Sequence, residues 1–162
     1  MKSGKIGIVV SGGPAPGINT VIWSAVLEAS NRGVVTVGFL NGFRGASSLE
    51  PNSWTFLNPQ SVAEIEAKGG SILGTSRFNP FHHNETKEAF IRTLQVHDVN
   101  KLIVIGGEGS AYLSHQVSQQ YPNIQVVHVP KTIDNDLILP NDHPSFGFET
   151  ARAVGTKVLK TL

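Results

Sequence analysis

Short apolar runs alternate along the chain with longer segments in which apolar residues recur every three or four positions. The short runs are rich in valine and isoleucine and predict buried β-strands at residues 6–10, 34–40, 101–105 and 125–129. The longer segments predict helices near residues 18–31, 61–68, 85–97, 110–119 and 145–161, with Asn84 as a candidate cap of the third. Alternating strands and helices are typical of a parallel sheet that is covered on both faces.

Three loops rich in glycine or acidic residues follow directly after predicted strands. They are SGGPAPG at 11–17, GGEGS at 106–110 and PKTIDND at 130–136. In open α/β sheets, ligands bind outside the carboxyl ends of the strands. We therefore expect an α/β, Rossmann-like fold with three αβα layers and a mainly parallel sheet, and a binding site where these loops meet.

Composition narrows the classes of partner. The chain has 162 residues, 13 basic and 12 acidic side chains and a net charge of +1, so it shows no charge signature for nucleic acid or for an acidic membrane surface. It has no cysteine, which excludes disulfides and thiolate metal sites and fits a cytoplasmic location. The first apolar run is too short for a signal peptide or a membrane-spanning helix. The 17 glycines cluster at the ends of apolar runs, where backbone can approach a ligand closely.

The first loop matches neither of two common phosphate-binding motifs. Gly12 and Gly17 fit the outer glycines of a dinucleotide fingerprint, but Pro14 occupies the middle position. The same two glycines fit a P-loop, but Ile18 and Asn19 stand where lysine and serine or threonine belong. A dinucleotide-binding oxidoreductase is therefore disfavoured. Glycine loops in front of helices can still present backbone N–H groups to phosphate oxygens.

Three carboxylates in these loops have two interpretations each. Glu108 lies between glycines before a predicted helix, where it can hold Mg²⁺ that is shared with phosphates or can simply face the positive end of the helix dipole. Asp134 and Asp136 lie two residues apart, where Asp134 can accept a proton from a hydroxyl or both can bind metal. The alternative for this pair is two ordinary turn residues.

The basic residues near these loops are also open to two interpretations. Arg77 and Lys131 can bind phosphate or can be surface charges. His82 and His83 suggest a metal site, but adjacent residues rarely face one ion, so an exposed loop is favoured.

Five sequence blocks together resemble the phosphofructokinase family. They are SGGPAPGIN, GGSILGTSR, GGEGS, PKTIDND and FGFETA, and they follow in this order between residues 11 and 151. The resemblance implies a phosphotransferase that moves a terminal phosphoryl group to the 1-hydroxyl of fructose 6-phosphate with Mg²⁺, a step of glycolysis. Positioning and charge neutralisation account for most of the catalysis of such a transfer.

The resemblance also assigns roles to individual residues. It implies that Asp134 is the catalytic base and that Glu108 is the metal-linked carboxylate. The implied donor-binding residues are Gly13, Arg77, Phe78, Gly107, Glu108, Gly109, Ser110 and Lys131, and the implied substrate-binding residues are Thr132, Ile133, Asp134 and Asp136.

The chain departs from the family pattern at four points. Pro14 replaces the usual aspartate of the first loop, and Glu108 is one methylene longer than the usual aspartate. Trp23 and Leu27 occupy positions where allosteric bacterial members carry effector-binding arginines, so regulation at that site is not expected. The family also continues beyond the length of this chain. We therefore expect residues 1–162 to be an N-terminal, donor-binding portion that lacks the sugar-phosphate half, from an enzyme that is a homo-oligomer when complete.

The resemblance leaves two phosphoryl donors open. Pyrophosphate users typically carry an aspartate directly after the metal-linked acid, and Gly109 at that position leaves room for ATP. Pyrophosphate users also typically carry the lysine that this chain has as Lys131. We favour ATP because exclusion by a blocking side chain is the stronger cue. The alternatives are a pyrophosphate-dependent phosphotransferase and a truncated nucleotide- or phosphate-binding module without catalytic activity.

Overall fold

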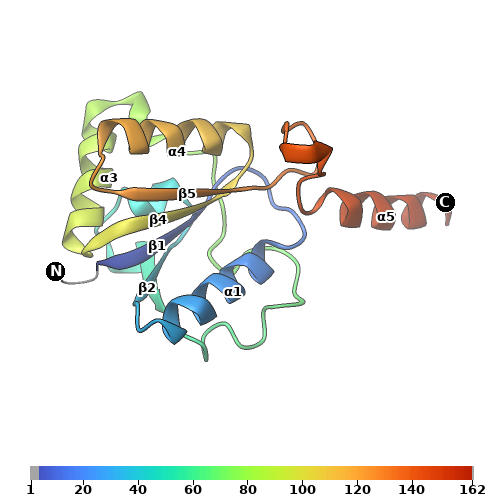
Figure 1. Ribbon diagram of the computed structural model, residues 1–162, viewed down its shortest axis with the longest axis horizontal. Coiled ribbons are helices and arrows are strands. Elements are labelled where there is room, and N and C mark those ends of the chain that lie inside the picture. The colour runs from blue at the N-terminus through green and yellow to red at the C-terminus, as the bar shows by residue number, and fades with distance from the viewer. Residues whose placement is uncertain (1–3, 162) are drawn as a thin grey trace.

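The computed structural model describes residues 4–161, which form a five-stranded sheet with helices on both faces (Figure 1). The strand order is β3-β2-β1-β4-β5, in which only β3 runs antiparallel to its neighbour. The strands are β1 Lys5–Val10, β2 Thr36–Phe39, β3 Trp54–Leu57, β4 Val99–Gly106 and β5 Gln125–Pro130. The helices are α1 Ile18–Asn31, α2 Phe43–Ala46, α3 Asn84–Val96, α4 Glu108–Gln120 and α5 Phe148–Leu159, with short 3₁₀ turns η1 Pro51–Ser53, η2 Pro80–His82 and η3 Pro140–Asp142. The expected α/β fold with a mainly parallel sheet is confirmed.

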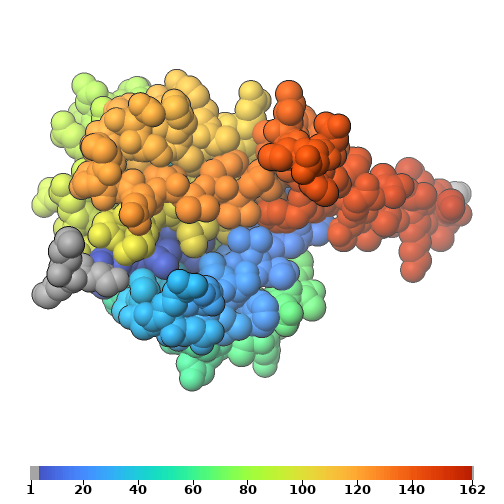
Figure 2. All heavy atoms as spheres, in the orientation of Figure 1, coloured from blue at the N-terminus to red at the C-terminus, as the bar shows by residue number. Residues whose placement is uncertain are grey.

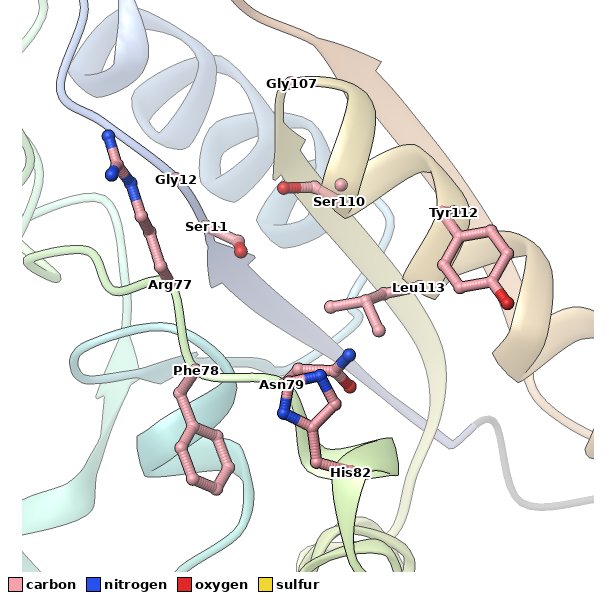
Figure 3. A pocket seen from close by; sticks show the side chains of 11 residues that line it. Ser11, Gly12, Arg77, Phe78, Asn79, His82, Gly107, Ser110, Tyr112 and Leu113 are labelled. Atoms are coloured by element: carbon pink, nitrogen blue, oxygen red, sulfur yellow. The ribbon is translucent and has the colours of Figure 1, made fainter.

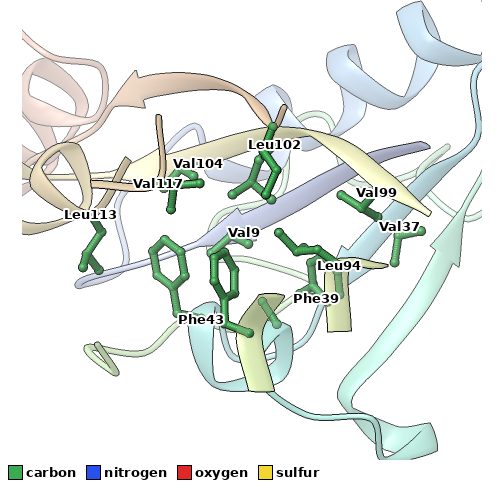
Figure 4. Close-up of a cluster of buried hydrophobic side chains, with 13 residues drawn as sticks. Val9, Val37, Phe39, Phe43, Leu94, Val99, Leu102, Val104, Leu113 and Val117 are labelled. Carbon is green, nitrogen blue, oxygen red and sulfur yellow. The ribbon is translucent and has the colours of Figure 1, made fainter. Parts of the chain in front are cut away.

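Alternate residues of the central strands supply two separate cores. On one face, Val9 of β1 and Val104 of β4 pack with Phe43, Phe90 and other buried side chains of α2, α3 and α4 (Figure 4). On the opposite face, Ile8, Val10 and Ile105 pack against the apolar stripe of α1 and the segment 57–73. Neighbouring residues of a strand point to opposite faces, so a continuous apolar run is the sequence signature of this two-sided burial.

Helix α5 extends from the body of the molecule (Figures 1 and 2). None of its residues is buried, and Val154, Val158 and Leu159 are 58%, 54% and 71% exposed. Its start is fixed to the first loop, because Gly147 has a φ of +94° and packs closely on Ala15. Within residues 4–161 no helix is long and apolar enough to span a membrane.

The structure corrects three sequence-based expectations. Residues 61–68 form turns and no helix; the carbonyls of Lys68 and Gly69 at the end of this segment accept hydrogen bonds from Asn19 of α1. Asn84 is the first residue of α3 and not its cap; His83, in extended conformation, holds the cap position, and no side chain there accepts a hydrogen bond from the helix. The edge strand β3 was not expected, since Trp54–Leu57 is short and half exposed.

Candidate active site

The loop after β4 begins with a glycine that its surroundings require. A Cβ atom at Gly106 would lie 2.5 Å from the carbonyl oxygen of Ser11 and 2.7 Å from the Cβ of Ser110. The carbonyl of Gly107 then accepts the N–H of Ser110 at 3.1 Å and begins α4. The contact between the end of β1 and the first turn of α4 places Glu108, the first residue of α4, beside the first loop.

The segment that carries Arg77 is anchored from α1 by a buried amide. Asn19, 3% exposed, donates to the carbonyls of Lys68 and Gly69 at 3.0 and 3.2 Å. Its Oδ1 accepts the N–H of Ile72 at 2.9 Å. One side chain therefore fixes both arms of the glycine-rich turn that precedes Arg77, and satisfied buried polar groups of this kind specify one conformation.

The end of the same segment is tied to the first loop. Thr75 donates its hydroxyl to the carbonyl of Gly12 at 2.7 Å, and the N–H of Gly12 donates to the carbonyl of Ser76 at 3.0 Å. The hydroxyl of Ser76 donates to the carbonyl of Asn41 at 2.6 Å. These bonds place Arg77 directly across from the glycines that follow β1.

The acidic loop after β5 is held by Ser145. The N–H of Thr132 donates to Ser145 Oγ at 3.1 Å, and that hydroxyl donates back to the carbonyl of Thr132 at 2.7 Å. Ser145 N–H donates to Asn135 Oδ1 at 3.1 Å, and the N–H of Asp134 donates to the hydroxyl of Thr132 at 3.0 Å. The backbone of the loop is thus satisfied internally, which leaves the carboxylates of Asp134 and Asp136 exposed.

Two hollows meet where these loops converge. The first, of about 390 Å³, is named here the Tyr112 hollow (Figure 3). Its lining residues are Ser11, Gly12, Arg77, Phe78, Asn79, His82, Gly107, Gly109, Ser110, Tyr112 and Leu113. The second, of about 380 Å³, is the Asp134 hollow, lined by Gly12, Gly13, Pro14, Arg77, Glu108, Gly107, Lys131, Thr132, Ile133, Asp134 and Asp136. Gly12, Arg77 and Gly107 line both, so the two hollows adjoin at these three residues.

Lys131 is a buried cation on the wall of the Asp134 hollow. Only 4% of the residue is exposed, its backbone N–H donates to the carbonyl of Gly106 at 2.9 Å, and its ammonium donates to the carbonyl of Gly13. Burial lowers the pKa of Lys131, and Arg77 lowers it further, whereas the carboxylate of Asp134 raises it. Desolvation and the neighbouring Arg77 both disfavour the charged form of Lys131. An anion bound in the hollow would offset this cost, because its negative charge attracts the ammonium.

The donor set at this site suits a metal that is shared with a ligand. No group of three or more His, Cys, Asp or Glu side chains within residues 4–161 is arranged to hold a metal ion. A complete protein cage is therefore absent from this part of the chain. Exposed Glu108, with Asp134 and Asp136 across the same hollow, fits Mg²⁺, which usually takes one or two carboxylates together with substrate phosphates.

All of the donor-binding and substrate-binding residues that the resemblance implies line one of the two hollows. Phe78 also has a structural role, because its ring packs against the core and lies 5.7 Å from the guanidinium of Arg44. Figure 3 shows Phe78 and Arg77 pointing in opposite directions from one segment. Sequence reasoning missed Asn79, His82 and Tyr112 as lining residues.

The histidine pair lies partly at the site. His82 lines the Tyr112 hollow, whereas both His82 and His83 are exposed and do not converge on a metal-binding cluster. The interpretation of this pair as an exposed loop is confirmed. No pattern in the sequence marks His82 as a residue of the wall, because the packing of α4 beside the Arg77 segment forms the hollow.

The fold places the chain among the α/β proteins whose sites lie at the carboxyl ends of a mainly parallel sheet. Within that class it belongs to the phosphofructokinase family, since the family's sequence profile matches residues 5–162. Solved structures agree on the fold. Phosphofructokinase from Saccharomyces cerevisiae superposes with a TM-score of 0.83 at 20% identity, over 98% of this chain and 24% of that one.

Relatives in the family differ in phosphoryl donor. A pyrophosphate–fructose 6-phosphate 1-phosphotransferase of Thermotoga maritima is 45% identical over 98% of this chain, and one of Naegleria fowleri is 44% identical over 97%. An ATP-dependent 6-phosphofructokinase of Thermotoga neapolitana is 39% identical over 82% of this chain. The chain spans 38%, 36% and 40% of the lengths of these three relatives, so it corresponds to less than half of each.

Proposed function

We propose that this chain is the donor-binding portion of a 6-phosphofructokinase, which transfers the terminal phosphoryl group of ATP to the 1-hydroxyl of fructose 6-phosphate. The observation that carries the proposal is the pair of adjoining hollows with a shared wall. Arg77 and the glycines at 12 and 107 line both, while Asp134 lines only one and Tyr112 only the other. A phosphate chain that crosses the shared wall would present its terminal group to Asp134.

Asp134 is the proposed general base. Its carboxylate would accept the proton of the sugar hydroxyl while that oxygen forms a bond to phosphorus and the bond to the donor's bridging oxygen breaks. The backbone around it is rigid, because Ser145 and Thr132 satisfy the loop by hydrogen bonds of 2.7–3.1 Å. Rigid placement matters because orientation of the reacting groups supplies a large part of the barrier reduction.

Cations of the site would neutralise the phosphates. Arg77 and Lys131 contribute positive charge from two sides of the Asp134 hollow. Glu108 and the donor phosphates would hold Mg²⁺, which screens charge on the transferring group when it is bound. Glu108 and Gly109, the first residues of α4, line the two hollows, and the free N–H groups of a helix's first turn suit phosphate oxygens.

The Tyr112 hollow favours ATP over a smaller donor. It adds about 390 Å³ next to the phosphate-facing hollow, with an aromatic ring, an amide and an imidazole on its wall. A Cβ atom built at Gly109 meets no heavy atom within 4 Å, so the space in which pyrophosphate users carry an aspartate is open here. Pyrophosphate has no group that would occupy this space.

Pyrophosphate is the second candidate donor, and two observations favour it. The relatives at 45% and 44% identity are both named as pyrophosphate-dependent. Lys131 also places a buried ammonium beside the Asp134 hollow, where it can attract a compact anion. An attraction of this kind does not exclude ATP, whereas a blocking carboxylate would.

The donor is tested in a chimaera in which these residues replace the matching portion of the Thermotoga maritima relative. Formation of fructose 1,6-bisphosphate is followed with ATP and with pyrophosphate. We expect a higher kcat/KM with ATP, and we expect Gly109→Asp to suppress ATP use more than pyrophosphate use. A strong preference for pyrophosphate with Gly109 intact would show that Lys131, and not the open space at Gly109, predicts the phosphoryl donor. A fragment restricted to residues 1–162 should show no turnover, because it corresponds to less than half of each relative that catalyses the transfer.

A further inference from the structure

A third hollow, of about 370 Å³, lies between α3 and the segment that follows α2 and shares no lining residue with the two hollows of the candidate site. Ser47 and Leu49, which follow α2, form one wall. Glu85, Glu88 and Arg92 of α3 form the other. We name it the Arg92 hollow. The positions 85, 88 and 92 recur at helical spacing, so the three charges lie along one face of α3.

The charges around the Arg92 hollow do not neutralise one another. Glu88 and Arg92 have the i,i+4 spacing, with the acid first, that favours an ion pair on a helix. Residues with the same spacing form an ion pair on α1, where Arg32 Nε lies 2.6 Å from Glu28 Oε1. Within the described range 4–161, Glu88 and Arg92 form no ion pair under 4 Å, although both line the hollow. A cation and two carboxylates therefore remain available to a ligand.

The other polar groups of the hollow are already engaged. The hydroxyl of Ser47 donates to the carbonyl of Phe43 at 2.8 Å, and the hydroxyl of Thr93 donates to the carbonyl of Ala89 at 2.8 Å. Leu49 is 42% exposed beside them. The hollow thus offers charges of both signs and an apolar surface, but few free uncharged hydrogen-bonding groups. These properties match a ligand that carries both charges at one end and an apolar group at the other.

From this arrangement we infer that the Arg92 hollow binds a small zwitterion with an apolar side chain, of the size and chemistry of leucine. The ligand's carboxylate pairs with Arg92 in the bidentate geometry that guanidinium favours. Its ammonium lies between Glu85 and Glu88, and its side chain contacts Leu49. The inference is independent of the phosphoryl-transfer function, because none of these residues belongs to the candidate active site.

The test is a titration of the chain with L-leucine, followed through backbone amide chemical shifts. We expect saturable shifts at residues 47–49 and 85–93, with a dissociation constant on the order of 1 mM for a ligand of this size. Isopentylamine, which lacks the carboxylate, and 4-methylpentanoate, which lacks the ammonium, probe each charge separately. Each should bind at least about tenfold more weakly than leucine, because a charged partner is left unmatched.

Matched variants separate the hollow from general surface charge. Arg92→Gln should weaken leucine binding at least about tenfold. Arg32→Gln, which removes the same charge from the closed pair on α1, should leave it unchanged. Both side chains are exposed, so neither change removes core packing. Absence of saturable shifts with leucine, equal binding of all three compounds, or unchanged binding in Arg92→Gln would each overturn the inference.

Discussion

The contact between β1 and α4 at Gly106 gives a sharp test of how the candidate site is built. In Gly106→Ala the new methyl group would lie 2.5 Å from Ser11 O and 2.7 Å from Ser110 Cβ. Rotation of the Ser110 side chain relieves neither contact, because one involves backbone and the other a Cβ atom. The end of β1 and the first turn of α4 must separate, and Glu108 moves with the helix.

The magnitude follows from the cost of inserting one carbon into a packed region. Such overpacking costs about 1–3 kcal/mol, which for a chain of this size lowers the melting temperature by roughly 2–12 °C. Gly109→Ala in the same loop is the matched control. Its Cβ meets no atom within 4 Å, so it should be neutral or should stabilise α4 by up to ~1 kcal/mol.

The assay is urea unfolding of both variants and the unsubstituted chain, analysed by linear extrapolation. We expect a large loss of stability in Gly106→Ala and none in Gly109→Ala. If the two variants unfold within about 0.5 kcal/mol of each other, the close approach of β1 and α4 does not determine the position of Glu108.

Two further predictions concern charge. Glu108→Gln should weaken Mg²⁺-dependent binding of ATP in calorimetric titrations, whereas Glu66→Gln at an exposed position should not; an unchanged metal dependence would return Glu108 to a helix-dipole role. His97 is 8% exposed, its ring lies 4.2 Å from that of Trp54, and burial lowers its pKa, with Lys5 lowering it further. Above the unfolded pKa of about 6.5 the ring is neutral in both states. Below it the unfolded chain binds the proton first, so the free energy of unfolding falls until the pH reaches the folded pKa. His97→Gln should reduce this slope and His83→Gln should not; equal slopes in all three proteins would show that His97 does not carry it.

The strands of the central sheet were predictable because burial on both faces leaves a continuous apolar run. Residues 101–105 illustrate this, since the run ends in two glycines where β4 meets α4. The edge strand β3 has no such run, because Phe56 is 50% exposed and only four residues pair with β2. The turns at 61–68 depend on Asn19, which is far away in sequence and anchors Lys68 and Gly69.

The candidate site was predictable at its loops and not at its far wall. Glycines and acids after strands mark the Asp134 hollow, since parallel strands bring their carboxyl ends together. Tyr112 and His82 have no such marker, because only the packing of α4 beside the Arg77 segment turns them toward one hollow. The contact between the ammonium of Lys131 and the carbonyl of Gly13 joins residues 118 positions apart, and no local pattern specifies it.

Turnover of Asp134→Asn in the chimaera with the Thermotoga maritima relative decides whether the phosphoryl group is transferred in the Asp134 hollow. Asparagine keeps the size of the side chain and removes the proton acceptor. We predict that kcat for phosphorylation of fructose 6-phosphate falls on the order of 10²–10⁴-fold with the preferred donor, while donor binding is retained. Near-normal turnover in Asp134→Asn would contradict the assignment of the Asp134 hollow as the place where the phosphoryl group is transferred.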